Sequence, residues 1–327
     1  MILVLHPGAL GDLILALPAL AALRSHFTGA HITIAGNQDY LRVIARGYAD
    51  ELLSLSVLPL HRLFSPDPLP PDDIRFWRSY HKVVSWTGAG DAVFERQLIS
   101  ANSAALIRSW RPEPGETRSV SQIFMDGLGS CLSPVEPDLR IRISLDESAF
   151  RSGDAWLREN AWTPELRLTA IHPGAGSLIK RWPADRYRDL TRALAQEEGS
   201  RIVIVEGPAE EGVASEVAQG IPSSAILIAR SLPLGRLAGV LARCQIFIGN
   251  DSGVSHLAAG LGVPSLLLFG PTSPRHWAPK GDRVEVIRRA QRCRGCARRK
   301  EEKHTCLENI SLHHVMSGIE HLRSFVS

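Results

Sequence analysis

The sequence predicts an α/β protein made of two Rossmann-like domains that face each other across a cleft. Strands and helices alternate through both halves, and a chain of 327 residues suits two domains of about 150 residues each. The halves also begin alike, because HPGA closes the first expected strand of each, at residues 6–9 and 172–175. We therefore expect an N-terminal domain at 1–163 and a C-terminal domain at 164–327, divided near Thr163-Pro164.

The N-terminal half shows short apolar runs separated by turns and helical segments. A buried strand at 2–6 is expected to pass through a glycine-bearing turn into a helix from about Leu13 to His26. The remaining expected elements are strands at 31–35, 52–57, 82–86 and 104–107, and helices at 120–131 and 147–160. Strands joined by helices in this way form a parallel sheet covered on both faces.

The C-terminal half repeats this pattern around one stretch, residues 248–279. There an apolar strand ends at Gly249-Asn250-Asp251, and a helix of small residues begins with Asp251 or Ser252 as its N-cap. Free N–H groups at such a helix start attract phosphate, although the same turn also fits an ordinary βαβ unit in which Asp and Ser only cap the helix. The other expected elements are strands at 168–172, 201–205, 225–228 and 265–269, and helices at 183–198, from 208, and at 233–243.

Charge and cysteine content exclude several classes of protein. Lysine and arginine number 37 against 34 acidic residues, so the net charge of +3 is too small to indicate nucleic-acid binding. Eight basic residues cluster between Arg288 and Lys303, which fits a solvated loop or contact with an anionic membrane or phosphorylated acceptor. The apolar run 13–23 is too short to span a bilayer, we expect no targeting leader, and five cysteines do not suit a disulfide framework. A cytoplasmic protein is expected.

Three motifs occur in order along nearly the whole chain. They are Gly8-Ala9-Leu10-Gly11-Asp12 with Pro18, then His172-Pro173-Gly174 with Ser177 and Lys180-Arg181-Trp182-Pro183, and finally residues 250–259 followed by 262–264 and 269–274. Together they resemble glycosyltransferase family 9, the ADP-heptose:lipopolysaccharide heptosyltransferases.

The resemblance implies the GT-B fold, inversion at the anomeric centre, and catalysis without a metal or other cofactor. It also implies that heptose passes from ADP-heptose to a lipopolysaccharide inner-core acceptor, a core or lipid A precursor. Such an enzyme would be a peripheral protein at the cytoplasmic face of the inner membrane, with no nucleic-acid partner.

Transfer from a nucleotide-sugar requires groups that stabilise the departing diphosphate. No Asp-x-Asp pair is present to hold a metal, so fixed groups must serve: Lys180, the amides of Ser252 and Gly253, and the hydroxyls of Ser177 and Thr272. Lys180 and Arg181 also fit a solvated helix start. Positive charge at that place opposes the helix dipole, which favours a bound anion.

The reaction also requires a base for the acceptor hydroxyl. Asp12 follows a turn whose Gly8 and Gly11 would admit an acceptor, and the resemblance implies that Asp12 is this base, on the acceptor side. From the residues alone, Asp12 is also a good N-cap for the following helix.

The resemblance places further residues on the donor side: His172, Gly174, Asp251 and His256. His256 could equally be a histidine packed within its helix. Either Glu210 or Glu211 resembles a family acid that holds ribose hydroxyls, and the sequence does not decide between the two.

One further constellation consists of Cys293, Cys296, His304 and Cys306, which could form a closed tetrahedral site for structural zinc or iron. His304 and Cys306 are only two residues apart, which strains joint ligation, and many members of the resembled family carry four cysteines where this chain has three. The alternative is a reduced set of cysteines in a surface loop.

Two other functions stay open. One is a GT-B relative that uses another nucleotide-sugar, as a transferase or a 2-epimerase. The other is a non-catalytic module that binds a nucleotide-sugar. An epimerase would turn over the donor alone, whereas a binding module would turn over nothing. The accepting sugar and its position do not follow from the sequence.

Overall fold

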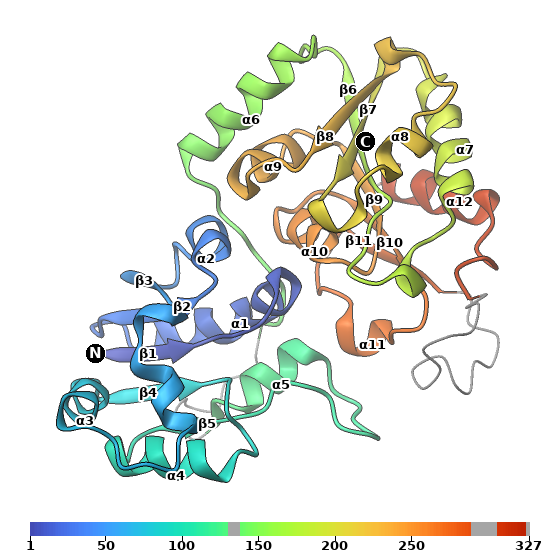
Figure 1. Cartoon of the computed structure of the whole chain (residues 1–327). Helices are drawn as coiled ribbons and strands as arrows, with labels where there is room; N and C mark the ends of the chain where they lie inside the picture. Colours follow the sequence, from blue (N-terminus) through green and yellow to red (C-terminus); the bar gives the residue numbers. More distant parts are fainter. Residues whose placement is uncertain (130–137, 289–305, 325–327) are drawn as a thin grey trace. The chain divides into compact units, whose positions relative to one another are not determined.

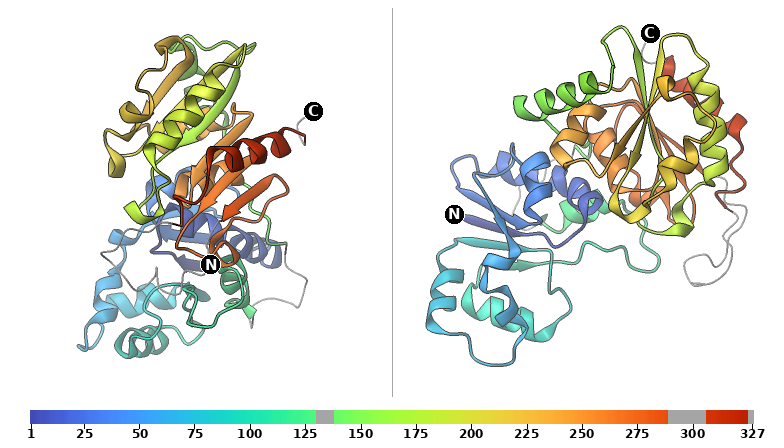
Figure 2. Two further views of the ribbon diagram at one scale, coloured as in Figure 1. Left: turned by 90° about the vertical axis from the view of Figure 1, so that its right-hand side faces the viewer. Right: turned by 45° about the horizontal axis from the view of Figure 1, so that its top comes forward.

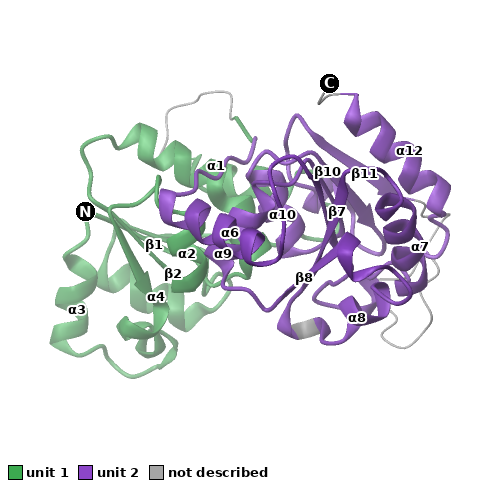
Figure 3. Ribbon diagram, turned by 90° about the horizontal axis from the view of Figure 1, so that it is seen from above, with its two compact units in different colours: residues 1–139 green, residues 140–327 purple. Residues whose placement is uncertain are grey.

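The computed structural model describes residues 1–129, 138–288 and 306–324. Backbone contacts divide the chain into an N-terminal unit, residues 1–139, and a C-terminal unit, residues 140–327 (Figure 3). The boundary expected near Thr163-Pro164 falls inside the C-terminal unit, because helix α6 (Glu147–Glu159) packs along α9 (Leu234–Leu241). Gly153 and Gly239 allow this close packing, since a Cβ on either would overlap the backbone of the other helix.

The N-terminal unit contains a five-stranded parallel sheet in the order β3-β2-β1-β4-β5 (Figure 1). Its strands are β1 (Ile2–Leu5), β2 (Ile32–Gly36), β3 (Glu51–Ser54), β4 (Lys82–Ser85) and β5 (Leu106–Ile107). The strand order changes direction between β1 and β4, and Leu5 pairs with Ser85 there, so His6 and Trp86 are the first residues beyond two neighbouring strands. The carboxyl end of such a switch point is where Rossmann-like sheets bind ligands.

Helices cover the strands of this first sheet. Helix α1 (Leu10–His26) is mostly apolar, buries much of its length and packs against α5 (Val120–Asp126). A separate core cluster forms around Leu3, Trp77 and Phe94. The other helical elements of this unit are α2 (Gln38–Ile44), η1 (Leu55–Val57), η2 (Pro59–Phe64), α3 (Pro71–Arg78) and α4 (Ala92–Ala101).

The C-terminal unit contains a six-stranded parallel sheet in the order β11-β10-β9-β6-β7-β8. Its strands are β6 (Arg167–His172), β7 (Ser200–Glu206), β8 (Ile226–Arg230), β9 (Ile246–Asn250), β10 (Ser265–Phe269) and β11 (Val284–Arg288). The order repeats that of the first sheet with one additional strand. Its switch point lies between β6 and β9, which places the second HPGA turn and the Asn250-Asp251-Ser252 turn on neighbouring strand ends.

Two sets of helices pack on this second sheet (Figure 2). Helices α7 (Ala184–Ala195), α8 (Val213–Val217) and α12 (Leu312–Arg323) form one buried core with alternate residues of β6, β7, β9 and β10. Helix α10 (Gly253–Gly260) contacts β9 and β10 and also packs on α9. The shorter elements are η4 (Leu178–Lys180), η5 (Pro208–Glu210), η6 (Ser223–Ala225) and α11 (Pro274–Trp277).

Several element boundaries differ from those expected. The first helix begins at Leu10 rather than near Leu13, because residues 7–9 suffice for the turn. The strand expected at 52–57 ends at Ser54, whose hydroxyl accepts the Ser56 N–H and starts η1. The helix expected at 120–131 ends at Asp126. Within the described ranges, no helix is both long and apolar enough to cross a membrane.

Candidate functional site

The first glycine turn follows β1 and carries Asp12. His6 is buried, and its Nδ1 accepts a hydrogen bond from the Gly8 N–H at 3.2 Å. Asp12 Oδ2 accepts a hydrogen bond from the Ala9 N–H at 3.1 Å. Gly8 lies between these two side chains, since a Cβ at Gly8 would be 2.6 Å from both His6 Cε1 and Asp12 Cβ. The close approach therefore requires glycine at this position.

Asp12 is the third residue of α1 and does not cap it. The N-cap position belongs to Ala9, whose side chain has no acceptor, so the interpretation of Asp12 as the N-cap is wrong. Its carboxylate instead accepts an N–H from the residue before the helix, as the acid of a capping box does. Asp12 also lies in the first helical turn, where the helix dipole favours negative charge. Gly11, the second helical residue, is half-buried.

The second HPGA turn follows β6 and contacts a buried acid. His172 Nδ1 donates a hydrogen bond to Val205 O at 3.1 Å, and His172 Nε2 lies 3.6 Å from Glu210 Oε1. Glu210 packs against Gly174, where a Cβ would be 2.3 Å from Glu210 Oε1. Of the two acids that the sequence left open, Glu210 is buried against this turn, whereas Glu211 is exposed.

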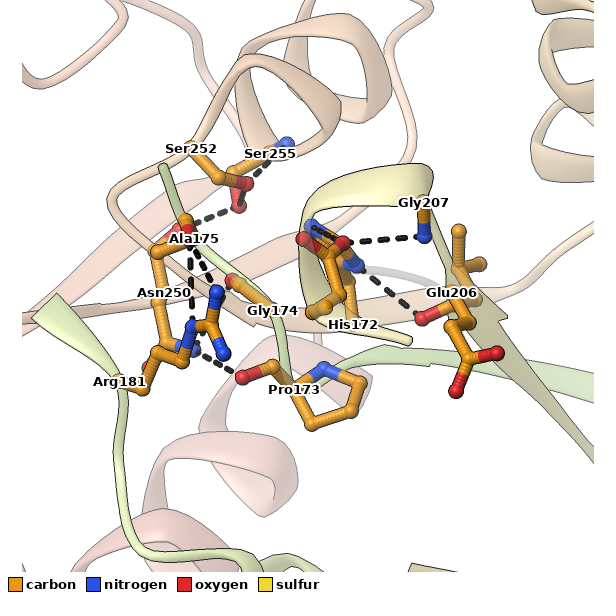
Figure 4. A network of polar contacts seen from close by, with 12 residues as sticks. His172, Pro173, Gly174, Ala175, Arg181, Glu206, Gly207, Asn250, Ser252 and Ser255 are labelled. Carbon is orange, nitrogen blue, oxygen red and sulfur yellow. Dashed lines mark hydrogen bonds and ion pairs between the residues drawn. The ribbon is translucent and has the colours of Figure 1, made fainter. Parts of the chain in front are cut away.

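Asn250 joins the turn after β6 to the turn after β9 (Figure 4). Its Nδ2 donates hydrogen bonds to Pro173 O at 2.9 Å and to Gly174 O at 3.1 Å, and its Oδ1 accepts one from the Trp182 N–H at 3.0 Å. The side chain is fully buried, so these bonds have no competition from solvent. One amide thereby fixes the relative positions of the two turns.

Three donors converge on the carboxylate of Asp251. Lys180 Nζ lies 2.8 Å from Oδ2, Thr272 Oγ1 donates to the same oxygen at 2.6 Å, and His256 Nε2 lies 3.6 Å from Oδ1. Asp251 is buried, whereas 30% of the Lys180 side chain stays exposed. The ammonium group is therefore held in place by a buried acid and can still contact a second anion from solvent.

The burial of these groups determines their protonation. Burial by itself would raise the pKa of Asp251, but the contact with His256 and the charge of Lys180 outweigh it and hold that pKa well below its usual range. Asp251 is therefore ionised. Burial also lowers the pKa of His172, against the opposing charge of Glu210. His172 carries a proton on Nδ1, since Val205 O can only accept.

Helix α10 begins at the same strand ends. Ser252, rather than Asp251, is its N-cap, and Ser252 Oγ accepts the Ser255 N–H at 3.3 Å. The Gly253 and Val254 N–H groups of the first turn have no carbonyl acceptor within the helix. The positive end of the helix dipole therefore lies beside the Asn250-Asp251 turn.

The remaining predicted residues lie in different places. Ser177 is half-buried in the same turn as Lys180, directly before η4. Cys293, Cys296 and His304 lie outside the described residues, and Cys306 is buried close to Gly270. Within the part of the chain that the structure describes, no group of three or more His, Cys, Asp or Glu side chains could hold a metal ion.

Sequence reasoning missed three residues that shape the turns. The motifs contain both Asn250 and Arg181, but they do not predict the contacts of either side chain. Arg181 Nε and Nη2 donate to Ala175 O at 3.2 and 3.0 Å (Figure 4). His6 was not selected although its counterpart His172 was. The repeated HPGA was the signal that could have identified His6. An asparagine directly after a buried apolar run was the corresponding signal for Asn250.

The chemistry available to each unit follows from these contacts. In the C-terminal unit a lysine and a helix start lie at the carboxyl ends of β6 and β9, which suits an anion such as a phosphate. The Thr272 O–H, after β10, is donated to Asp251 and so helps to hold this acid rather than an anion. Glu210 adds a carboxylate that can accept hydrogen bonds from hydroxyl groups. The N-terminal unit offers a half-buried carboxylate, Asp12, that can accept a proton.

Known proteins resemble this chain in sequence and fold. The model of glycosyltransferase family 9 (heptosyltransferase) matches residues 135–307. Lipooligosaccharide heptosyltransferase 2 of Haemophilus influenzae is 29% identical over 136 residues, which are 40% of this chain and 39% of that protein. The chain thus aligns with about two fifths of the length of this curated relative.

Solved structures resemble the chain over nearly its whole length. A family 9 glycosyltransferase from Veillonella parvula superposes with a TM-score of 0.80 at 21% identity, covering 98% of this chain and 96% of that one. The E. coli ADP-heptose LPS heptosyltransferase II superposes with a TM-score of 0.73 at 18% identity, covering 98% of each. These likenesses and the two parallel-sheet units confirm the expected GT-B fold class. Because the family model covers more than half of its residues, the chain belongs to glycosyltransferase family 9, the heptosyltransferase family.

Proposed function

We propose that this chain is an inverting glycosyltransferase that moves heptose from ADP-heptose to an inner-core sugar of a lipopolysaccharide precursor. Membership of family 9 supports the reaction type, and the name of the E. coli heptosyltransferase of similar fold supports the donor. The observation that carries the proposal is the cluster of Lys180, Thr272 and the start of α10 at the switch point of the C-terminal sheet. The acceptor is part of a membrane lipid, so we place the enzyme at the cytoplasmic face of the inner membrane.

The donor diphosphate is proposed to lie on the C-terminal unit. Lys180 would supply the positive charge and the Gly253 and Val254 amides would donate hydrogen bonds, with Ser177 as a further hydroxyl donor. Asp251 would hold Lys180 in place rather than bind the anion, because like charges repel. Glu210 would accept hydrogen bonds from the ribose hydroxyls, and Gly174 leaves the space that this carboxylate occupies.

The proposed step balances without a metal. The oxygen of the acceptor hydroxyl forms a bond to the anomeric carbon of heptose, and the bond from that carbon to the phosphate oxygen breaks. The electron pair leaves with ADP, whose developing charge Lys180 and the α10 amides stabilise. The acceptor proton passes to the carboxylate of Asp12, because an inverting attack comes from the face opposite the leaving group.

Mass spectrometry of the reaction products tests this proposal. ADP-heptose is incubated with the protein, with and without a heptose-deficient lipopolysaccharide precursor. The proposal expects an acceptor that gains one heptose and ADP that forms only when the acceptor is present. An epimer of the sugar nucleotide in the absence of acceptor, separated from the donor by chromatography because the two have the same mass, would instead indicate an epimerase. No product with any acceptor would indicate a binding module.

A thermal-shift panel of ADP-, UDP- and GDP-sugars tests the choice of donor. A ligand that binds the native state alone raises its melting temperature by mass action. ADP-sugars should therefore give the largest increase. Stabilisation by UDP-sugars without stabilisation by ADP-sugars would contradict the adenine nucleotide.

A further inference from the structure

His6 is the histidine of the first HPGA turn. The residue is 1% exposed, and its ring lies among three aromatic rings of the N-terminal unit. The ring stacks on Trp110 with centroids 6.3 Å apart, lies 5.6 Å from Phe124, and meets Trp86 edge-on at 5.8 Å. The surrounding side chains therefore fix both the position and the plane of the imidazole.

The hydrogen bond of His6 assigns its tautomer. Its Nδ1 accepts the Gly8 N–H at 3.2 Å, so the ring proton lies on Nε2. Among the residues that the structure describes, Nε2 finds no hydrogen-bond acceptor. Burial lowers the pKa of His6 to about 4, which keeps the ring neutral and Nδ1 able to accept.

Gly8 transmits the position of the ring to Asp12. Gly8 lies close to both side chains: a Cβ added to Gly8 would be 2.6 Å from His6 Cε1, 2.6 Å from Asp12 Cβ and 3.1 Å from Asp12 Oδ2. The next N–H of the turn, on Ala9, donates to Asp12 Oδ2 at 3.1 Å. Two successive amides of the turn are thus held, one by His6 and one by Asp12 itself.

We infer that His6 is a positioning residue for Asp12. By accepting the Gly8 N–H from a fixed aromatic site, it sets the conformation of the turn and so the direction in which the Asp12 carboxylate points. The inference rests on the proposed function for its effect on turnover, because it takes Asp12 as the base. The hydrogen bond and its effect on the turn can be measured without any transfer.

A purely structural role for His6 makes a different prediction. If the ring served only to fill the aromatic core, then any ring of similar size would replace it. His6→Phe keeps the aromatic packing and removes the acceptor. His6→Asn loses much of the packing but places Oδ1 where Nδ1 lies, because both atoms are bonded to Cγ. The two variants therefore separate packing from hydrogen bonding.

The test compares kcat, the KM for donor and the melting temperature of both variants with those of the wild type. Positioning predicts that His6→Phe keeps its melting temperature and donor KM but loses about 10- to 100-fold in kcat, because misplacement of a reacting group by about 1 Å costs about that much. His6→Asn should melt earlier and keep kcat within about threefold. A wild-type kcat in His6→Phe, or a loss of kcat in His6→Asn that equals that of His6→Phe, would overturn the inference.

The Gly8 amide proton, observed by NMR in the full-length protein, gives an answer that does not depend on activity. Its resonance should move upfield in His6→Phe, where the hydrogen bond is lost, and stay near its wild-type position in His6→Asn. If the wild type transfers no sugar, the proposed function fails and this measurement alone decides the positioning role. Equal shifts in the two variants would count against it.

Discussion

The two HPGA turns have the same sequence and follow the first strand of their sheets, yet their histidines have opposite hydrogen-bonding roles. His6 Nδ1 accepts the Gly8 N–H within its own turn, whereas His172 Nδ1 donates to Val205 O on the neighbouring strand. The ring proton therefore lies on Nε2 of His6 and on Nδ1 of His172. Four identical residues leave the tautomer undetermined, and the partner in the folded chain decides it.

Both turns also press a glycine against a carboxylate, but the carboxylate comes from a different place in each. Gly8 contacts Asp12 of the helix that follows directly, whereas Gly174 contacts Glu210 from the loop after β7. The first turn leads into α1 at Leu10, and the charged residue beside it is the acid Asp12. The second continues through η4 and adds Lys180. This difference matches the proposed roles, with proton acceptance at the first turn and donor binding at the second.

Replacement of Asp12 should have the largest effect. Asp12→Asn keeps an oxygen that can accept the Ala9 N–H but cannot take a proton, so we expect transfer to slow by about 10²- to 10⁴-fold in a normally folded protein. The measurement is kcat with saturating donor and acceptor. Asp12→Ala also loses the contact with Ala9 and should in addition be less stable. Wild-type turnover in Asp12→Asn would exclude the base role.

The second prediction concerns stability against pH. The pKa of His6 is about 4 in the folded protein, whereas the ordinary value of 6.5 applies to the unfolded chain. Between pH 6.5 and about 4, the unfolded chain therefore binds a proton at His6 that the folded chain does not bind. The stability that the neutral ring contributes is fully present above pH 6.5 and is lost as the pH falls to about 4. The loss in the free energy of unfolding is about 3 kcal/mol, because each unit of pKa difference corresponds to about 1.36 kcal/mol.

Denaturant unfolding of wild type and His6→Phe at pH 7 and pH 4 checks this expectation. The titration of all other groups is common to both proteins. Between pH 7 and pH 4, the free energy of unfolding should therefore fall by about 3 kcal/mol more in the wild type than in His6→Phe. Equal losses in the two proteins would show that His6 titrates normally in the folded state.

The third prediction sharpens the comparison of the two glycines. Gly174→Ala would place its Cβ 2.3 Å from the Glu210 carboxylate and force that side chain out of its site, at a cost of about 1–3 kcal/mol in the free energy of unfolding. A Cβ at Gly176, two residues later, would meet open space within 4 Å. Gly176→Ala is therefore the matched control, and chemical denaturation should show a change within about 0.5 kcal/mol for it. Similar values for both variants would remove Glu210 from contact with the turn.

The smallest expected effect concerns the helix that begins at the site. Ser252 caps α10 and Ser311 caps α12, so replacing either serine with alanine should cost about 1 kcal/mol of stability. Only Ser252→Ala should also weaken ADP binding, because only α10 begins at the proposed diphosphate site. Calorimetric titration with ADP and thermal unfolding of both variants separate capping from binding. Equal ADP affinity in the two variants would place the diphosphate elsewhere.

Much of the fold was predictable from the sequence, because alternating apolar runs and turns define parallel strands in both units. The ends of elements were less predictable, since they depend on local contacts. The strand expected at 52–57 stops where the Ser54 hydroxyl accepts an N–H. The division expected near Thr163-Pro164 lies inside the C-terminal unit, because α6 packs on α9, which is far away in the sequence.

The roles of Asp12, Lys180 and Ser252 in the reaction stay predictions, but their positions after strand ends were predictable from the motifs that contain them. The interactions that hold these groups were not, because they join residues far apart in the sequence. Asn250 reaches back to Pro173, and Lys180 pairs with Asp251, 71 residues away. The choice between Glu210 and Glu211 depended on which side chain turns toward Gly174, and the spacing of two adjacent acids does not reveal this.

Calorimetric titration of ADP into Lys180→Ala and Asp12→Asn tests the division of roles between the two turns most directly. The ammonium of Lys180 should make a charge-assisted contact worth about 1.5–3 kcal/mol, so Lys180→Ala should raise the Kd for ADP by about 10- to 150-fold. Lys280→Ala, which removes an exposed lysine near the amino end of β11, is the matched control and should leave the Kd unchanged. Asp12→Asn should bind ADP as the wild type does. An unchanged Kd in Lys180→Ala, or a Kd raised equally by Asp12→Asn, would contradict the account.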